Sequence, residues 1–234
     1  MKKLLLIGAV ALTTISLVAA DSNPKDEITA AAKKLADSAN YSWRSTVAVP
    51  EDAQFKPGPT EGKTEKDGFT TLSLSFFDNN TQAILKGNKL AINMPDAGWQ
   101  SAADIEKEEG MGQFFVALVR NVKTPAAEAT DLASHAKELK KDGEAYTSDL
   151  TEEGAKAMQA FKMPNAEPPT VNNAKGSVKF WLKDGALVKY EFKLKGNMSF
   201  NGNDFENDRT TTVEIKDVGS TKLDVPDEAK KKLQ

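Results

Sequence analysis

The stretch from Ser177 to Pro226 constrains the fold most, because apolar and charged residues alternate along much of its length. Alternation with a period of two is typical of β-strands that bury one face. It predicts a strand on each side of an Asp-Gly dipeptide, then a polar turn, one more strand and a proline-marked exit. The stretch therefore predicts an antiparallel sheet with one covered face.

The loop of this hairpin decides which side chains share a face. A two-residue loop would set Phe180 opposite Lys189, which mixes apolar and charged side chains. A three-residue loop over 183–185, with its glycine left-handed, keeps the large apolar residues together. We therefore expect the three-residue loop, with Trp181 and Leu187 as neighbours on the other face.

The first twenty of the 234 residues have the pattern of a secretory signal peptide. Lys2 and Lys3 precede an apolar run over 4–18, and small residues lead to a cleavage site after Ala20. The short signal looks bacterial, so we expect a secreted, periplasmic protein whose mature form is a single domain over residues 21–234. No cysteine follows the apolar run, so we expect no lipid anchor and no stable membrane anchor.

Composition excludes two classes of protein. The chain contains no cysteine, so an exported domain of this size must hold together by burial rather than by disulfides. Loss of Lys2 and Lys3 would leave 29 of the 31 basic side chains against 34 acidic ones, a formal charge of −5. An acidic balance argues against a nucleic-acid partner.

The order of the expected elements defines the fold class. Strands come first, helices are grouped in the middle, and strands return at the end, which describes an α+β fold: a curved antiparallel sheet, or half-barrel, with a helical insert covering its concave face. A proline- and glycine-rich loop is expected over 51–66 and a linker over 163–173. The clearest helical period comprises Met111, Phe114, Phe115, Leu118, Val119 and Val122.

The sequence offers little for catalysis. His135 is the only histidine, and it lies on an amphipathic helical pattern without a nucleophile motif or further metal ligands nearby. We interpret it as a partly exposed surface residue. No enzyme activity, metal or cofactor is predicted.

Four segments together have the pattern of a known family: KFWLKDGALVKYEFKLKG, RTTTVEIKDVGSTKLDVP, KGNKLAINMPDAGWQ and ANYSWRSTV. They resemble the corresponding segments of the LolA/LolB-like and LppX/LprG-like carriers of bacterial envelopes. The resemblance implies a half-barrel whose concave face, lidded by helices, holds a lipid or acyl chain. This chain departs from the lipoprotein members by lacking the anchoring cysteine, and no arginine matches a family position at the mouth.

The large apolar side chains form the only constellation with functional potential. They could line a cavity between sheet and helices, where an acyl chain would gain about 0.8 kcal/mol per buried methylene. They could equally fill the space, which would make the protein a structural or protein-interaction module that acts through Trp181 and the 51–66 loop. The cavity candidates are Leu74, Phe76, Met94, Phe115, Leu118, Phe180, Tyr190 and Phe192.

Overall fold

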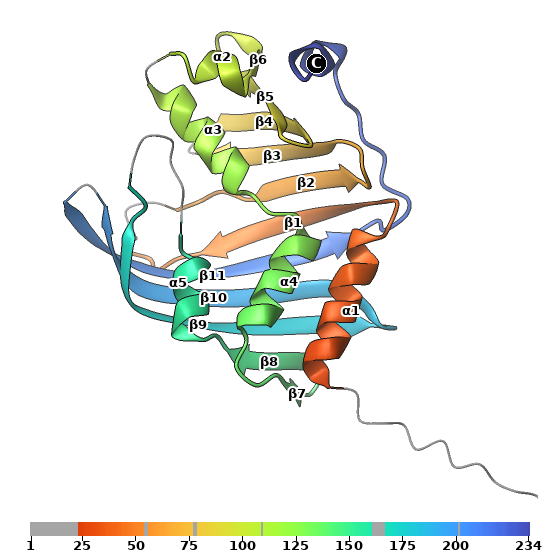
Figure 1. Ribbon diagram of the computed structural model, residues 1–234, viewed down its shortest axis with the longest axis vertical. Coiled ribbons are helices and arrows are strands. Elements are labelled where there is room, and N and C mark those ends of the chain that lie inside the picture. Colours follow the sequence, from red (N-terminus) through yellow and green to blue (C-terminus); the bar gives the residue numbers. More distant parts are fainter. Residues whose placement is uncertain (1–22, 54–55, 77–78, 109, 161–166, 201) are drawn as a thin grey trace, which may run out of the picture.

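A single antiparallel sheet organises the chain in the computed structural model (Figure 1). The structure describes residues 23–234 except 54–55, 77–78, 109, 161–166 and 201. The eleven strands are β1 (Asn40–Ala48), β2 (Thr60–Glu65), β3 (Thr70–Phe76), β4 (Asn79–Lys86), β5 (Lys89–Met94), β6 (Gly98–Ser101), β7 (Lys140–Asp142), β8 (Ala145–Asp149), β9 (Thr170–Lys183), β10 (Ala186–Phe200) and β11 (Asn203–Lys216).

The sheet is open, with β6 at one edge and β7 at the other. Its order is β6-β5-β4-β3-β2-β1-β11-β10-β9-β8-β7, so every neighbour follows in sequence except β1 and β11. That pair joins the early and late strands, with Trp43 opposite Ile215. The predicted α+β fold, a curved antiparallel sheet that does not close, is confirmed.

The described helices other than the C-terminal one gather on one face of the sheet, which we call the inner face (Figure 1). The opposite face is called the outer face. Packing on the inner face buries apolar residues from α1 and α4 against β9 and β10, including Ile28, Leu132 and Phe180. The helices are α1 (Pro24–Ala36), α2 (Ala102–Ile105), α3 (Met111–Asn121), α4 (Pro125–His135), α5 (Glu152–Ala157) and α6 (Asp227–Lys232).

The register of the hairpin between β9 and β10 differs from the expected one, and the predicted three-residue loop is wrong. Ala186 pairs with Lys183, so the loop has two residues, Asp184 and Gly185, both with positive φ (52° and 70°). Such angles suit the tight turn that Asp-Gly favours. The mismatch of faces is resolved instead by an irregularity between Leu187 and Lys189.

Because of this irregularity, the prediction that Trp181 and Leu187 are neighbours on one face is wrong. Leu187 pairs with Leu182 and is buried in the main core. Trp181 pairs with Lys189, whose Nζ lies over the Trp181 ring at 4.6 Å from its centroid. A bulge close to the turn carries no marker in the apolar pattern, so the alternation assigned Leu187 to the wrong face.

Part of the expected loop over 51–66 is in fact a central strand. β2 pairs with both β1 and β3, and its buried positions are Gly62 and Thr64. The indole of Trp43 occupies the space where a side chain at position 62 would stand. The strand therefore lacks large apolar residues because its neighbour supplies the packing, and this removes the alternation by which strands are recognised.

The polar turn expected after β10 is also strand. β10 continues to Phe200 and β11 begins at Asn203, with the two paired over their whole length. β9 likewise begins at Thr170, inside the expected linker. These extensions form a long ribbon on the left of Figure 1, beside α5.

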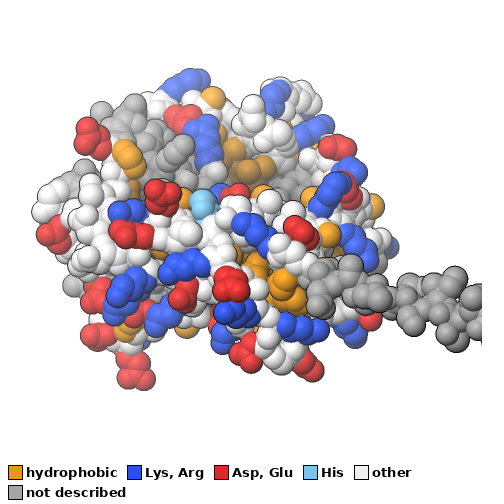
Figure 2. All heavy atoms as spheres, turned by 60° about the horizontal axis from the view of Figure 1, so that its bottom comes forward, with side chains coloured by type: hydrophobic (Ala, Val, Ile, Leu, Met, Phe, Trp, Pro, Cys, Tyr) orange, Lys and Arg blue, Asp and Glu red, His pale blue; other side chains and the backbone are white. Residues whose placement is uncertain are grey.

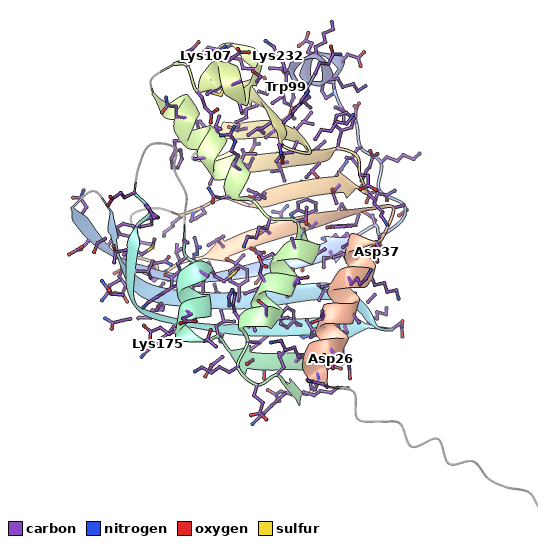
Figure 3. The ribbon with its side chains drawn as sticks, viewed as in Figure 1. Asp26, Asp37, Trp99, Lys107, Lys175 and Lys232 are labelled. Atoms are coloured by element: carbon purple, nitrogen blue, oxygen red, sulfur yellow. The ribbon has the colours of Figure 1, made fainter. Side chains whose placement is uncertain are left out.

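A smaller cluster covers part of the outer face. Ala229 and Leu233, at the C-terminal helix α6, pack against Ile84 and Ala91 of β4 and β5. Trp99 joins this cluster and lies close to Lys232 (Figure 3). The chain after β11 thus crosses the outer face to reach the opposite edge of the sheet.

Candidate functional site

Part of the inner face is filled by side chains. Phe180, Tyr190 and Leu194 have no exposed surface, and the Tyr190 ring stacks on Phe192 with centroids 6.3 Å apart. Helices α1 and α4 close this part from above with Ile28 and Leu132, which are equally buried. No space for a ligand remains among these side chains.

The other end of β9–β11 is hollow. A cavity of about 500 Å³ lies between these strands, α3 and the end of α5, a volume within the roughly 300–1,000 Å³ range of small-molecule sites. Phe205 stands at its rim and is 49% exposed, which is unusual for a phenylalanine in a folded domain. The apolar lining residues are Phe114, Leu118, Val122, Met158, Phe192, Met198 and Phe205.

The cavity arises from a change of residue type along the inner face of β11. Opposite Tyr190 and Phe192 this strand carries Val213 and Thr211, but farther along it carries Arg209 and Asn207. The long polar side chains of this pair replace the compact β-branched residues that lie on the first part of the face. Packing therefore ends at the middle of the strand, and the remaining face lines the cavity.

A hydrogen-bonded polar group forms one wall. Asn207 Nδ2 donates to Gln159 Oε1 at 2.7 Å, and Gln159 Nε2 donates to the Ala155 carbonyl at 3.0 Å. A Cβ at position 196 would come within 3.2 Å of Gln159 Oε1, so Gly196 leaves room for this amide. The wall is thus held rigidly by the turn that ends α5.

Two charged residues meet the cavity at its inner end. Tyr190 Oη donates to Glu128 Oε2 at 2.7 Å, and Glu128 comes from the first turn of α4. Burial raises the pKa of Glu128 above its ordinary value, while the Tyr190 hydrogen bond opposes that shift. Burial also lowers the pKa of Arg209, and the nearby Glu128 carboxylate opposes this change. Burial raises the pKa of Tyr190 well above its ordinary value, so its hydroxyl stays protonated and donates the hydrogen bond.

Arg209 is the exceptional member of this group. Its Nε is buried without a hydrogen-bond partner, the only such side-chain nitrogen or oxygen in the described part of the chain. The sequence analysis missed Arg209, Glu128, Asn207 and Gln159. The one available signal was a pattern break, a positively charged residue at a position of β11 where alternation demands an inward side chain.

The eight predicted cavity residues fall into different environments. Leu118 and Phe192 line the cavity. Leu74, Phe180 and Tyr190 are buried in the filled core, and Met94 and Phe115 pack against that core while partly exposed. The side chain of Phe76 lies outside the described residues. Their roles in ligand binding stay predictions.

A second hollow, of about 530 Å³, lies on the outer face beneath the chain that leads to α6. Arg44 forms an ion pair with Glu61, and Lys63 Nζ donates to the Lys222 carbonyl at 3.4 Å. The lining is dominated by polar side chains, and its charged groups contact one another or the C-terminal segment. We therefore regard the inner cavity as the candidate ligand site.

Other kinds of site find no support in the described residues. No three His, Cys, Asp or Glu side chains among them lie close enough to hold a metal ion. His135 is partly exposed at the end of α4, and Gly154 lies against its Cβ. None of the described helices has the length and apolarity needed to cross a membrane. The predicted signal peptide lies outside the described residues.

Comparison with known proteins returned structural matches. No protein-family model matches the chain, and no curated protein matches its sequence. The lipoprotein LppX of Mycobacterium tuberculosis aligns with a TM-score of 0.48 and 10% identity, over 85% of this chain and 96% of LppX. LprF from Mycobacterium bovis gives 0.45 and 9%, over 87% and 95%.

A LolA superfamily protein from Nitrosomonas europaea also matches, with a TM-score of 0.34 and 9% identity, over 87% of this chain and 96% of that one. These proteins are of the class that the sequence resemblance named. At such identities no residue of this chain can be matched to a residue of theirs, so the likeness concerns the fold alone.

Proposed function

We propose that this protein is a non-catalytic carrier or binding protein that sequesters an apolar molecule, such as a lipid acyl chain, in the inner cavity. The observation that carries the proposal is the apolar cavity of about 500 Å³ between β9–β11, α3 and α5. The predicted export signal supports a site of action outside the cytoplasm, in the periplasm of a bacterial envelope. The resemblance to envelope carriers supports the same assignment.

The energetics favour an aliphatic ligand. The lining combines phenylalanine and methionine side chains, and methionine adapts readily to chains of different shape. Each methylene that moves from water into this lining gains about 0.8 kcal/mol, so about ten would contribute roughly 8 kcal/mol before the entropic costs of binding. This contribution is sufficient to bind an acyl chain without any covalent step.

The alternative, an interaction module with a filled core, is less well supported by the surface. Trp181 is partly buried, and Lys189 lies over its ring. Among the described residues, only Phe205 and Val218 are large apolar side chains with high exposure, and Phe205 belongs to the cavity rim. In the view of Figure 2, acidic and basic side chains are intermixed and the apolar areas between them are small.

Native mass spectrometry of the mature protein, purified from its own cell envelope, tests the proposal. We expect a stoichiometric ligand that appears as a mass increment and is recovered by organic extraction. Uptake of Nile red, an uncharged dye that fluoresces in apolar surroundings, by ligand-free protein provides the second test. A protein that carries no extractable lipid and takes up no dye would refute the carrier function.

A further inference from the structure

Arg209 has no ion-pair partner among the residues that the structure describes. Its side chain lines the cavity, its Nε is buried, and no described residue accepts a hydrogen bond from it or forms an ion pair with it. Arginine is rarely buried in proteins unless it is paired. The guanidinium therefore has donors available that a ligand could use.

The neighbouring charges are already engaged. Glu128 Oε2 accepts the hydrogen bond of Tyr190, and Glu128 acts on Arg209 electrostatically from beyond ion-pair distance. Lys123, also at the cavity, contacts Asp131 with its Nζ 2.6 Å from Oδ2. Within the described part of the chain, Arg209 is consequently the cation at this site that forms no ion pair.

The surroundings of Arg209 determine what kind of anion fits. Met198 pairs with Phe205 on the same face of the ribbon, four residues along β11 from Arg209. At a rise of about 3.3 Å per residue, that apolar surface begins roughly 13 Å from the arginine. A ligand that reaches both regions must have one charged end and one apolar end.

We propose that Arg209 binds the carboxylate of a single-chain amphiphile of the fatty-acid class, whose tail lies against Met158, Met198 and Phe205. The inference rests on the proposed carrier function and specifies its ligand. The planar guanidinium presents paired donors that match the two oxygens of a carboxylate, and such charge-assisted hydrogen bonds are about twice as strong as neutral ones. Glu128 repels further negative charge, so a singly charged head is preferred over a phosphate dianion.

Competition experiments with ligands of one chain length test this assignment. Nile red is first bound to the ligand-free mature protein, which tests the carrier function alone. Hexadecanoic acid, hexadecanol, methyl hexadecanoate and hexadecyl phosphate then compete with the dye at pH 8. We expect the acid to bind at least about tenfold more tightly than the alcohol and the ester, the effect of one charge-assisted hydrogen-bonded pair.

Substitutions test whether Arg209 causes the preference for the acid over the alcohol and the ester. Arg209→Gln should make the affinities for the acid, the alcohol and the ester equal. Arg44→Gln removes an arginine from the outer face and should leave the preference intact. Urea unfolding of each variant verifies that it is folded, and the wild-type comparison decides the question even if Arg209→Gln does not fold.

The outcomes separate the two proposals. Dye uptake with equal affinity for acid and ester, or an acid preference that survives Arg209→Gln, would overturn the role of Arg209 and leave the carrier function standing. Tighter binding of hexadecyl phosphate than of the acid would overturn the carboxylate assignment. Absence of binding by the dye and by all four competitors would refute the carrier function itself.

Discussion

The indole of Trp43 packs directly over Gly62 on the neighbouring strand, in the space that a Cβ would occupy. Trp43 is only 5% exposed, so the ring cannot move outward without opening the core. β1 and β2 are adjacent in the middle of the sheet, and this contact holds them in register. A glycine is therefore required at position 62 for steric reasons, although its backbone angles are ordinary.

Replacing Gly62 by alanine should destabilise the protein by about 1–3 kcal/mol, the usual cost of overpacking a core. Urea unfolding measures the change. Glu61→Ala, one residue away and exposed, removes only a surface ion pair with Arg44 and should cost less than about 1 kcal/mol. If Gly62→Ala costs as much in a Trp43→Phe background as in the wild type, the overlap with the indole is not the cause.

Glu128 should make stability fall with rising pH. Its pKa is raised in the folded state above its ordinary value of 4.5, so the folded protein retains this proton to higher pH than the unfolded chain. The stability associated with the protonated form is fully present below the unfolded pKa and is lost as pH rises through the folded pKa. Glu128→Gln cannot ionise, so its stability relative to wild type should increase over that interval.

Urea midpoints of wild type and Glu128→Gln between pH 4 and pH 8 provide the measurement. Glu153→Gln, at an exposed position in the first turn of α5, controls for the loss of one negative charge. If the stability of Glu128→Gln minus that of wild type stays constant or decreases as pH rises, the role assigned to burial is contradicted.

Filling the cavity should weaken binding of an apolar ligand. Ala157 lines the cavity from α5 and is itself exposed, so tryptophan at this position can enter the cavity without disturbing the core. Nile red should bind Ala157→Trp about tenfold more weakly, equivalent to losing about two methylenes of burial. Ala30→Trp, an exposed alanine in α1, is the matched control and should retain wild-type affinity.

Replacing Arg209 by methionine should stabilise the ligand-free protein. The change removes a buried donor that lacks a partner and keeps a long side chain at this position of β11, opposite Leu194. The expected gain is about 1–3 kcal/mol in unfolding free energy, the cost of a buried unsatisfied polar group. The measurement is urea unfolding after passage over a lipophilic resin, and a loss of stability would show that Arg209 is satisfied in the folded protein.

The sequence alone determined the sheet and most of its helices. Alternation identified β9, β10 and the early strands β1 and β3, and the period of Phe114, Phe115 and Leu118 identified α3. Burial on one face selects apolar residues at such regular intervals. The order of these elements then led to an open antiparallel sheet with helices on one face. These features depend on neighbours in sequence, which local patterns record.

The tertiary structure decided what local patterns do not record. β2 lacks apolar alternation because Trp43 supplies its packing from the next strand, and the bulge near Leu187 shifted a whole face of the hairpin. Arg209 and Glu128 come from distant parts of the chain. From the sequence alone, both charged side chains would be expected at the solvent-exposed surface. They meet at the cavity because α4 packs on the inner face of the sheet, the face on which Arg209 of β11 lies, so the polar end of the site was decided by packing and not by sequence spacing.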